Sequence, residues 1–197
     1  LSMYTTLNYS PNFEIKKRKS NQIKFIIFHY TGMKKETESI KRLTDQYSKV
    51  SAHYLIKNNG EIVVLVPDLY VAWHAGISSC KTFKSLNKNS IGIEISNPGH
   101  NFKYKKFSKK QIESIKKLSK FFIKKYKINQ KNILGHSDIA PNRKMDPGEK
   151  FPWKYLSKLK LAYWNNLNEK KIKKLHLIKL NKIEKKNFFK NINEIGY

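Results

Sequence analysis

The chain has 197 residues and a formal net charge of +27, from 41 lysine and arginine residues against 14 aspartate and glutamate residues. This length is enough for one domain with a buried core and a tail, and too short for two full domains. The single cysteine, Cys80, excludes an intramolecular disulfide, and no apolar run in the sequence reaches the length of a membrane span.

The positive charge raises the question of nucleic acid, a membrane surface or an acidic substrate. Only three of the cations are arginines, Arg18, Arg42 and Arg143, although arginine is expected where bases and phosphates are bound bidentately. Lysine, asparagine and isoleucine are abundant and share AT-rich codons. We therefore attribute most of the charge to an AT-rich genome and expect no specific nucleic-acid partner. No signal peptide is visible at Leu1, and a cleaved leader would give the same start, so the compartment stays open.

The first element expected is a buried strand, after an irregular and basic N-terminal segment (1–20). Residues 23–30 are nearly all apolar, β-branched or aromatic, which is typical of a strand buried on both faces. His29 lies at the C-terminal end of this strand, where open α/β sheets place their sites. From the residues alone, the default interpretation of His29 is a buried core histidine.

A helix and a β-hairpin follow. Apolar and aromatic residues spaced three and four apart predict an amphipathic helix over 36–50, with one face formed by Ile40, Leu43 and Tyr47. Residues 52–57 and 62–66 flank Asn59-Gly60, a pair typical of a hairpin turn. The loop 71–76 comes next, where Trp73 is a candidate for the core and His74, beside small residues, is a candidate for contacting substrate.

Residues 90–96 have the clearest strand pattern in the chain. Three isoleucines face one way, and the other side carries Gly92, Glu94 and Ser96. A carboxylate in a central strand is costly unless it is paired or used. From the residues alone, a structural salt bridge and a functional role for Glu94 stay equally open.

A second helix is predicted over 108–127. Ser108 and Gln111 have the spacing of a capping box, and one face is lined by Ile112, Ile115, Leu118, Phe122 and Tyr126. The lysines of this helix are most simply a solvated face. Beyond the main domain we expect a lysine-rich helical extension (157–197), with helices over 156–164 and 169–186 and a terminal helix packed on the domain.

The loop 135–148 follows a short apolar run and is expected to be irregular, since it contains two prolines and a closing glycine. His136 and Asp146 offer an imidazole and a carboxylate, both of which bind zinc. Taken alone, two such residues ten positions apart in a loop are more often surface groups. If Met145 is extended, Lys144 and Asp146 point to the same side.

Several of these stretches resemble, in order, motifs of the N-acetylmuramoyl-L-alanine amidases of the amidase-2 family, the AmpD and AmiD type. The resemblance covers about residues 23–153. Its motifs are His-Tyr-Thr at 29–31, Ser-Ala-His-Tyr-Leu-Ile at 51–56, Ala-Trp-His-Ala-Gly at 72–76, Ser-Ile-Gly-Ile-Glu at 90–94, the loop 136–148 and Phe-Pro-Trp at 151–153. The chain departs from the family at Asn142, where glycine is usual, and asparagine tolerates the left-handed conformation better than most residues.

The resemblance implies an α/β domain over 21–156, with a mixed central β-sheet flanked by helices, and one zinc ion per chain. The implied zinc ligands are His29, His136 and Asp146. The implied catalytic residues are Glu94, as general base, and Lys144, which would face the oxyanion. The implied substrate contacts are Tyr30, Trp73, His74 and Arg143.

The reaction implied is hydrolysis of the amide between N-acetylmuramic acid and L-alanine, in peptidoglycan or in anhydromuropeptides. Such an enzyme would serve cell-wall degradation or muropeptide recycling in a bacterium, in the cytoplasm or the cell envelope, and we expect a monomer. One alternative is a non-catalytic peptidoglycan-recognition module, but such members typically lack a zinc ligand, and all three are present here. A basic nucleic-acid-binding protein is the other alternative, and no recognition motif supports it.

Overall fold

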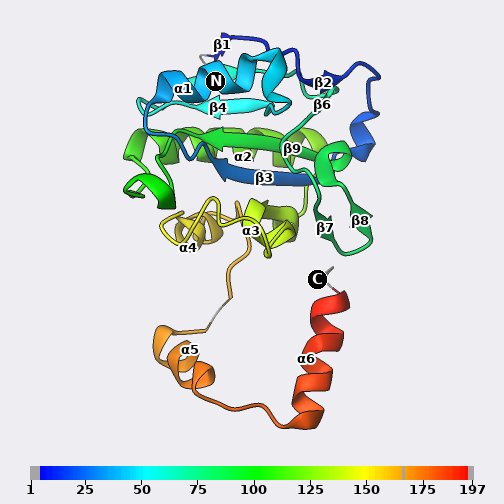
Figure 1. Ribbon diagram of the computed structural model, residues 1–197. Helices are drawn as coiled ribbons and strands as arrows, with labels where there is room; N and C mark the ends of the chain where they lie inside the picture. The colour runs from blue at the N-terminus through cyan, green and yellow to red at the C-terminus, as the bar shows by residue number, and fades with distance from the viewer. Residues whose placement is uncertain (1–4, 166, 195–197) are drawn as a thin grey trace.

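The computed structural model describes residues 5–165 and 167–194 (Figure 1). At its centre is a mixed six-stranded sheet with the strand order β1 (Thr5–Leu7), β5 (Ile62–Val64), β4 (Tyr54–Ile56), β9 (Ser90–Ile95), β3 (Phe25–Tyr30) and β10 (Ile133–Gly135). Two small sheets pair β2 (Phe13–Glu14) with β6 (Val71–Ala72), and β7 (Ser79–Cys80) with β8 (Phe83–Lys84). The antiparallel pair β4 and β5 confirms the predicted hairpin.

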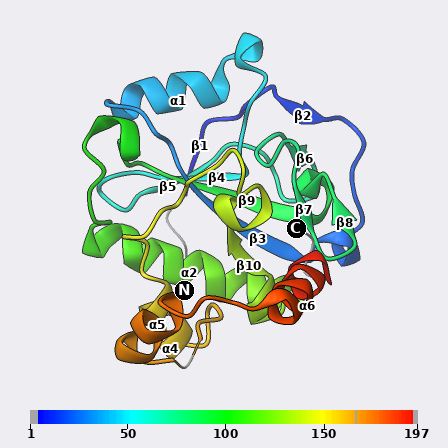
Figure 2. The same cartoon turned by 60° about the horizontal axis from the view of Figure 1, so that its bottom comes forward.

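Helices flank this sheet, which confirms the predicted fold class. The α-helices of the described residues are α1 (Glu36–Thr44), α2 (Lys109–Tyr126), α3 (His136–Ile139), α4 (Trp153–Lys158), α5 (Glu169–His176) and α6 (Lys182–Glu194). Figure 2 shows α1 and α2 on opposite sides of the sheet. The side chain of Ser108 accepts a hydrogen bond from the main-chain N–H of Gln111 (3.2 Å), so α2 begins at the predicted capping box.

The largest apolar cluster lies between the sheet and α2. It joins Ile91, Ile93 and Ile95 of β9 to the buried face of the helix, formed by Ile115, Leu118 and Phe122. Because successive side chains of a strand alternate between faces, the remaining residues of β9, Ser90, Gly92 and Glu94, face the other way. That second face is covered by α1 at one end and by β7, β8 and α3 at the other, and apolar clusters lie beneath both covers.

The N-terminal segment differs from the irregular chain expected over 1–20. β1 pairs in parallel with β5, and β2 pairs antiparallel with β6. Arg18 is buried, and its guanidinium donates to the carbonyl oxygens of Asp68 (3.0 Å) and Ser90 (2.8 Å). Strands of two or three residues are too short to show a period, and these form because an existing sheet edge supplies their partners.

Two local predictions were wrong in detail. The helix expected over 36–50 ends at Thr44, because the carboxylate of Asp45 accepts from the N–H of Tyr47 (3.0 Å) and starts a separate turn, which leaves Tyr47 79% exposed. The loop expected after β10 begins with the one-turn helix α3, where Asp138 accepts from the N–H of Gly135 (2.7 Å). In both places a side-chain bond to the main chain decides the local structure.

The C-terminal extension holds α5 and α6, but the boundary between them differs from the expected helix over 169–186 and terminal helix, because α5 ends at His176 and α6 begins at Lys182. Asn181 and Glu184 exchange side-chain to main-chain hydrogen bonds (2.8 and 2.9 Å) and so begin α6. The helix expected over 156–164 is α4, which ends before Lys160, a residue with a left-handed φ of 57°. Figure 1 shows α5 and α6 below the layers of the domain. None of the helices in the described part of the chain is long and apolar enough to cross a membrane.

Candidate metal and active site

Two neighbouring parallel strands bring His29 and Glu94 together. In the pairing of β3 with β9, His29 lies directly opposite Glu94, so the two side chains leave the same face of the sheet. Both lie towards the C-terminal ends of their strands, the edge at which open α/β sheets form binding crevices. The strand register therefore places a histidine and a carboxylate side by side.

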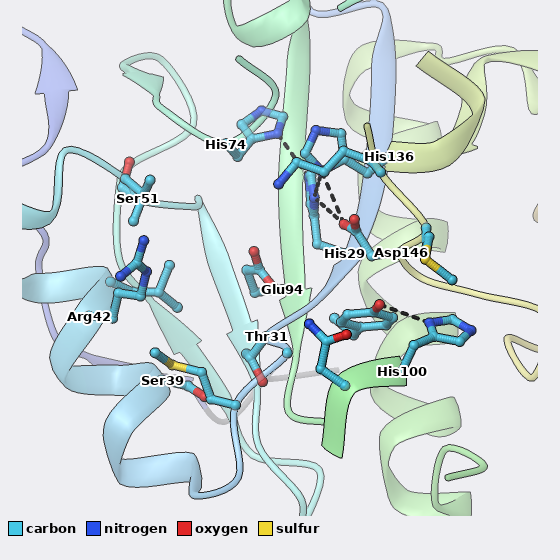
Figure 3. Close-up of a pocket in the computed structure, with 18 of the residues that line it drawn as sticks. His29, Thr31, Ser39, Arg42, Ser51, His74, Glu94, His100, His136 and Asp146 are labelled. Atoms are coloured by element: carbon cyan, nitrogen blue, oxygen red, sulfur yellow. Dashed lines mark hydrogen bonds and ion pairs between the residues drawn. The ribbon is translucent and has the colours of Figure 1, made fainter. Parts of the chain in front are cut away.

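A pocket of about 370 Å³ opens over this edge of the sheet (Figure 3). His29 and Glu94 form its floor. One wall comes from α1 and includes Ser39 and Arg42, and the opposite wall comes from α3 and the loop 143–146. The loop predicted to carry the chemistry thus faces α1 across the two strand ends.

Three predicted metal ligands meet at this pocket. The Nδ1 atoms of His29 and His136 are 2.9 Å apart, and each lies 3.0 Å from Oδ2 of Asp146. All three residues are buried, and within the described chain they are the group of side chains that could hold a metal ion. Figure 3 shows the three side chains converging from β3, α3 and the loop.

The hydrogen-bonding capacity of these atoms favours a cation among them. Nε2 of His136 lies 3.1 Å from the carbonyl oxygen of Ala75, which can only accept, so Nε2 carries the proton and Nδ1 presents a lone pair. One proton on Nδ1 of His29 could not satisfy all three contacts of the triangle. A divalent cation would, and two histidines with one carboxylate are a zinc set that leaves a coordination position open.

The protonation states suit metal binding. Burial, assisted by the neighbouring His136, lowers the pKa of His29 to about 4. Burial would raise the pKa of Asp146, but its contacts with His136 and His29 outweigh this and hold that pKa well below its usual range. At neutral pH the site therefore presents a neutral imidazole and an ionised carboxylate, the forms that bind metals.

Glu94 differs from these three because one of its oxygens is unpaired. Its Oε2 is buried and has no hydrogen-bond partner in the described residues. Burial, together with the charge of Asp146, raises the pKa of Glu94 to about 8, although Lys144 opposes the shift. A buried polar atom without a partner costs free energy. The side chain points into the pocket (Figure 3), where a water molecule or a substrate group could supply the missing contact.

Lys144, Tyr30 and Trp73 also line the pocket. The hydroxyl of Tyr30 lies 2.9 Å from Nδ1 of His100, and Nε2 of His100 lies 2.9 Å from a carboxylate oxygen of Glu149. His100 and Glu149 were not predicted from the sequence. No local pattern marks them, because 70 residues separate Tyr30 from His100 along the chain.

His74 and Arg143 line the same pocket, but other protein groups hold their polar atoms. His74 is 8% exposed, and its Nδ1 lies 3.0 Å from Nε2 of His29. Burial, with His29 adding to it, lowers the pKa of His74 well below the ordinary value, so this imidazole is neutral. The guanidinium of Arg143 donates to the carbonyl oxygens of Ala75 and Ile77. The substrate contacts expected of both residues stay predictions.

Comparison with known proteins agrees with this geometry. The family model of N-acetylmuramoyl-L-alanine amidase matches residues 19–149. The amidase AmiD of Escherichia coli is 40% identical over 155 residues, which are 73% of this chain and 55% of AmiD. The 1,6-anhydro-N-acetylmuramyl-L-alanine amidase AmpD of Haemophilus influenzae is 32% identical over 170 residues, which are 77% of this chain and 90% of AmpD.

A solved structure matches the fold as well. The complex of Escherichia coli AmiD with anhydro-N-acetylmuramic acid-L-Ala-D-γ-Glu-L-Lys aligns with a TM-score of 0.68 at 38% identity. The alignment covers 74% of this chain and 60% of that one. The chain therefore spans a little over half of AmiD and most of AmpD.

Proposed function

Because the chain belongs to the N-acetylmuramoyl-L-alanine amidase family, we propose that it hydrolyses the amide between the lactyl group of N-acetylmuramic acid and L-alanine. One zinc ion would be held by His29, His136 and Asp146. The observation that carries this proposal is the convergence of three buried donor atoms beside the unpaired carboxylate oxygen of Glu94. Amide hydrolysis at neutral pH needs an activated water and a proton donor for the leaving amine, and these groups can supply both.

When bound, zinc would acidify water and polarise the scissile carbonyl. Glu94 would accept a proton from the attacking water at Oε2 and pass it to the leaving nitrogen as the C–N bond breaks. General acid–base catalysis of this kind is worth about 10² to 10⁴ in rate. The carboxylate has to be ionised for this role, although burial raises its pKa to about 8. Positive charge near the carboxylate favours its ionised form, and Lys144 supplies such charge within the described residues.

Lys144 would stabilise the negative charge that develops on the carbonyl oxygen. It lines the pocket two residues before Asp146, and its ammonium group has no hydrogen-bond partner in the described part of the chain. A preorganised cation at this place acts mainly on the transition state, because the oxyanion exists only there. The products would be a muramyl carboxylic acid and a peptide with a free L-alanine amine.

The wall opposite the zinc loop suits a substrate that carries carboxylates. Arg42 of α1 lines the pocket and has no hydrogen-bond or ion-pair partner in the described residues. Its guanidinium is therefore free to bind a carboxylate bidentately, and stem peptides are rich in carboxylates. AmiD has been solved with an anhydromuramyl peptide. We propose the same chemical class for this chain, as intact peptidoglycan or as anhydromuropeptides.

Neither alternative is favoured. A non-catalytic recognition module does not need the complete donor set that this chain brings together. The positive charge is the only argument for nucleic-acid binding. The lysines of α2 lie on the solvent face of this helix, opposite the buried Ile115 and Leu118. This is the arrangement expected of a solvated helix.

The decisive experiment is mass spectrometry of products from purified muropeptides, with anhydro and reduced forms run in parallel. We expect the release of a stem peptide that begins with L-alanine, loss of this activity on chelation, and its return with zinc. Recovery of intact substrate only would contradict the amidase assignment. Full activity of protein shown to be metal-free by elemental analysis would contradict the zinc assignment.

A further inference from the structure

Two adjacent residues face the far nitrogens of the proposed zinc-binding histidines. Nδ1 of His74 lies 3.0 Å from Nε2 of His29, and the carbonyl oxygen of Ala75 lies 3.1 Å from Nε2 of His136. The main-chain N–H groups of both residues donate to one side-chain oxygen, Oδ1 of Asn87 (3.1 and 2.7 Å). One short segment, held by Asn87, therefore orients both histidines.

The neighbouring strand leaves room for the ring of His74. A Cβ atom built on Gly92 of β9 would lie 2.3 Å from Cγ of His74, far inside van der Waals contact. Only glycine at this position lets the imidazole reach His29. Gly92 lies between Ser90 and Glu94 on the pocket side of β9, so this face of the strand is shaped around the ring.

The hydrogen bonds from Leu86 through Ser90 to His74 fix which atom donates in each contact. The carbonyl oxygen of Leu86 can only accept, and it lies 2.6 Å from Oγ of Ser90, so the serine proton is directed to it. Oγ of Ser90 then accepts from Nε2 of His74, at 3.1 Å. A neutral His74 with its proton on Nε2 has its lone pair on Nδ1, so His29 must donate from Nε2. Nδ1 of His29 is thereby left as a lone pair that faces His136 and Asp146.

His29 has a second tautomer, with its proton on Nδ1, that would interfere with metal binding. The carboxylate of Asp146 lies 3.0 Å from Nδ1 of His29 and would attract a proton to that nitrogen. A proton on Nδ1 would occupy the position of the metal. The acceptor supplied by His74 moves the proton to the other side of the ring, away from the site.

We propose that His74 and Ser90 form a positioning relay, which holds His29 in the tautomer that binds zinc. This inference rests on the zinc site of the proposed function, and it gives His74 a role other than contact with substrate. Partners on the far nitrogen of a metal-binding histidine are typically worth about 10- to 100-fold in metal affinity or activity.

The chain offers a matched control for the serine. Ser90→Ala removes the acceptor for His74. Ser119 of α2 is equally buried, and its hydroxyl also donates to a carbonyl four residues earlier, that of Ile115 (2.7 Å), but no histidine contacts it. Ser119→Ala therefore removes the same kind of bond without touching the relay. At the histidine, His74→Leu removes the acceptor, whereas His74→Asn keeps an oxygen near the place of Nδ1.

Two measurements are needed on each variant after thermal unfolding has shown that it folds. The zinc dissociation constant comes from competition with a chromogenic chelator, and the tautomer of His29 comes from imidazole ¹⁵N shifts of the metal-free protein. We expect Ser90→Ala and His74→Leu to bind zinc about 10- to 100-fold more weakly and to shift His29 towards the Nδ1–H tautomer. Ser119→Ala should match the wild type, and His74→Asn should recover part of the loss.

Wild-type zinc affinity together with an unchanged His29 tautomer in Ser90→Ala would overturn the relay. An equal loss of affinity in Ser119→Ala would also overturn it, because the effect would then be one of general stability. Failure of the wild type to bind zinc would contradict the proposed function instead. In that case the ¹⁵N shifts of the metal-free protein would still decide whether His74 and Ser90 set the tautomer. If His74→Leu does not fold, Ser90→Ala carries the test.

Discussion

The two faces of β9 hold different kinds of residue. The face towards α2 carries Ile91, Ile93 and Ile95, all fully buried in the main core. The face towards the pocket carries Ser90, Gly92 and Glu94. The first face stabilises the fold by removing apolar area from water, at about 25 cal/mol for each Å² buried. Polar groups on the second face cost free energy unless each of them finds a partner.

Stability and chemistry therefore reside on opposite faces of β9. Ser90 hydrogen-bonds His74, Gly92 makes room for the same ring, and Glu94 keeps an unpaired buried oxygen. We therefore expect changes on the α2 face to alter stability with little effect on turnover, and changes at the pocket to lower turnover. Variants on the two faces and in the loop 143–146 test that division.

Asp146→Ala should have the largest effect, because it removes one of three metal donors. We expect loss of bound zinc and of measurable amidase activity. Elemental analysis beside a muropeptide assay would check both. Met145→Ala is the matched control, since Met145 is adjacent but 59% exposed, and it should keep its zinc. Near-stoichiometric zinc in Asp146→Ala would rule out this donor.

Glu94→Gln should lower kcat by about 10² to 10⁴, the range for loss of a general base. Glutamine keeps the shape of the side chain but cannot accept the proton of water. Zinc content should stay at the wild-type value, because Glu94 lies outside the donor triangle. Near-normal turnover, or loss of zinc, would show that the role of base is assigned to the wrong residue.

Lys144→Met should lower kcat by about 10² to 10³, as for the loss of one oxyanion donor, with a smaller change in KM. Methionine keeps much of the stem and removes the charge. Lys120→Met, on the exposed side of α2, loses the same charge away from the pocket and should leave kcat unchanged. A fall confined to KM would indicate a substrate-binding role for Lys144 instead.

Ile93→Ala tests the opposite face of the same strand. Ile93 is fully buried between β9 and α2, and its truncation should lower the free energy of unfolding by about 2 to 5 kcal/mol. Turnover of the folded, zinc-loaded variant should stay close to that of the wild type. Denaturant unfolding beside kcat measures both quantities. A large fall in kcat at unchanged stability would contradict the division between the faces.

The metal-free protein gives a test of Glu94 by pH. Its pKa is raised from 4.5 to about 8 in the folded state, chiefly by burial. Between these values the unfolded chain has released the proton and the folded chain has not, so the wild type loses stability as pH rises. Glu94→Gln does not titrate. The free energy of unfolding of Glu94→Gln, relative to that of the wild type, should therefore increase from pH 5 to pH 8. A difference in unfolding free energy that stays constant over this range would contradict the raised pKa of Glu94.

Local signals in the sequence determined the elements that carry the fold. The apolar run of β3, the alternation of β9 and the capping box of α2 each depend on residues within a few positions of one another. Each of these three elements was predicted within about two residues of its observed bounds. The alternation in β9 also separated Glu94 from the isoleucines. The motifs, read as a family resemblance, predicted His29, His136 and Asp146 as metal ligands, and the fold brings these three residues together.

The contacts between the histidines of the site depend on the tertiary structure. His29 and His136 are 107 positions apart, and His29 and His74 are 45 apart. Their contacts follow from strand order and register, which no local pattern encodes. For the same reason β1 and β2 were missed, since such short strands exist only beside a partner. The fold also places Nδ1 of His74 3.0 Å from Nε2 of His29, because Gly92 of an adjacent strand leaves space for the ring there. The hydrogen-bond partner of a buried side chain is set by the neighbours that the fold supplies, so the tautomer of His29 could not be read from the sequence.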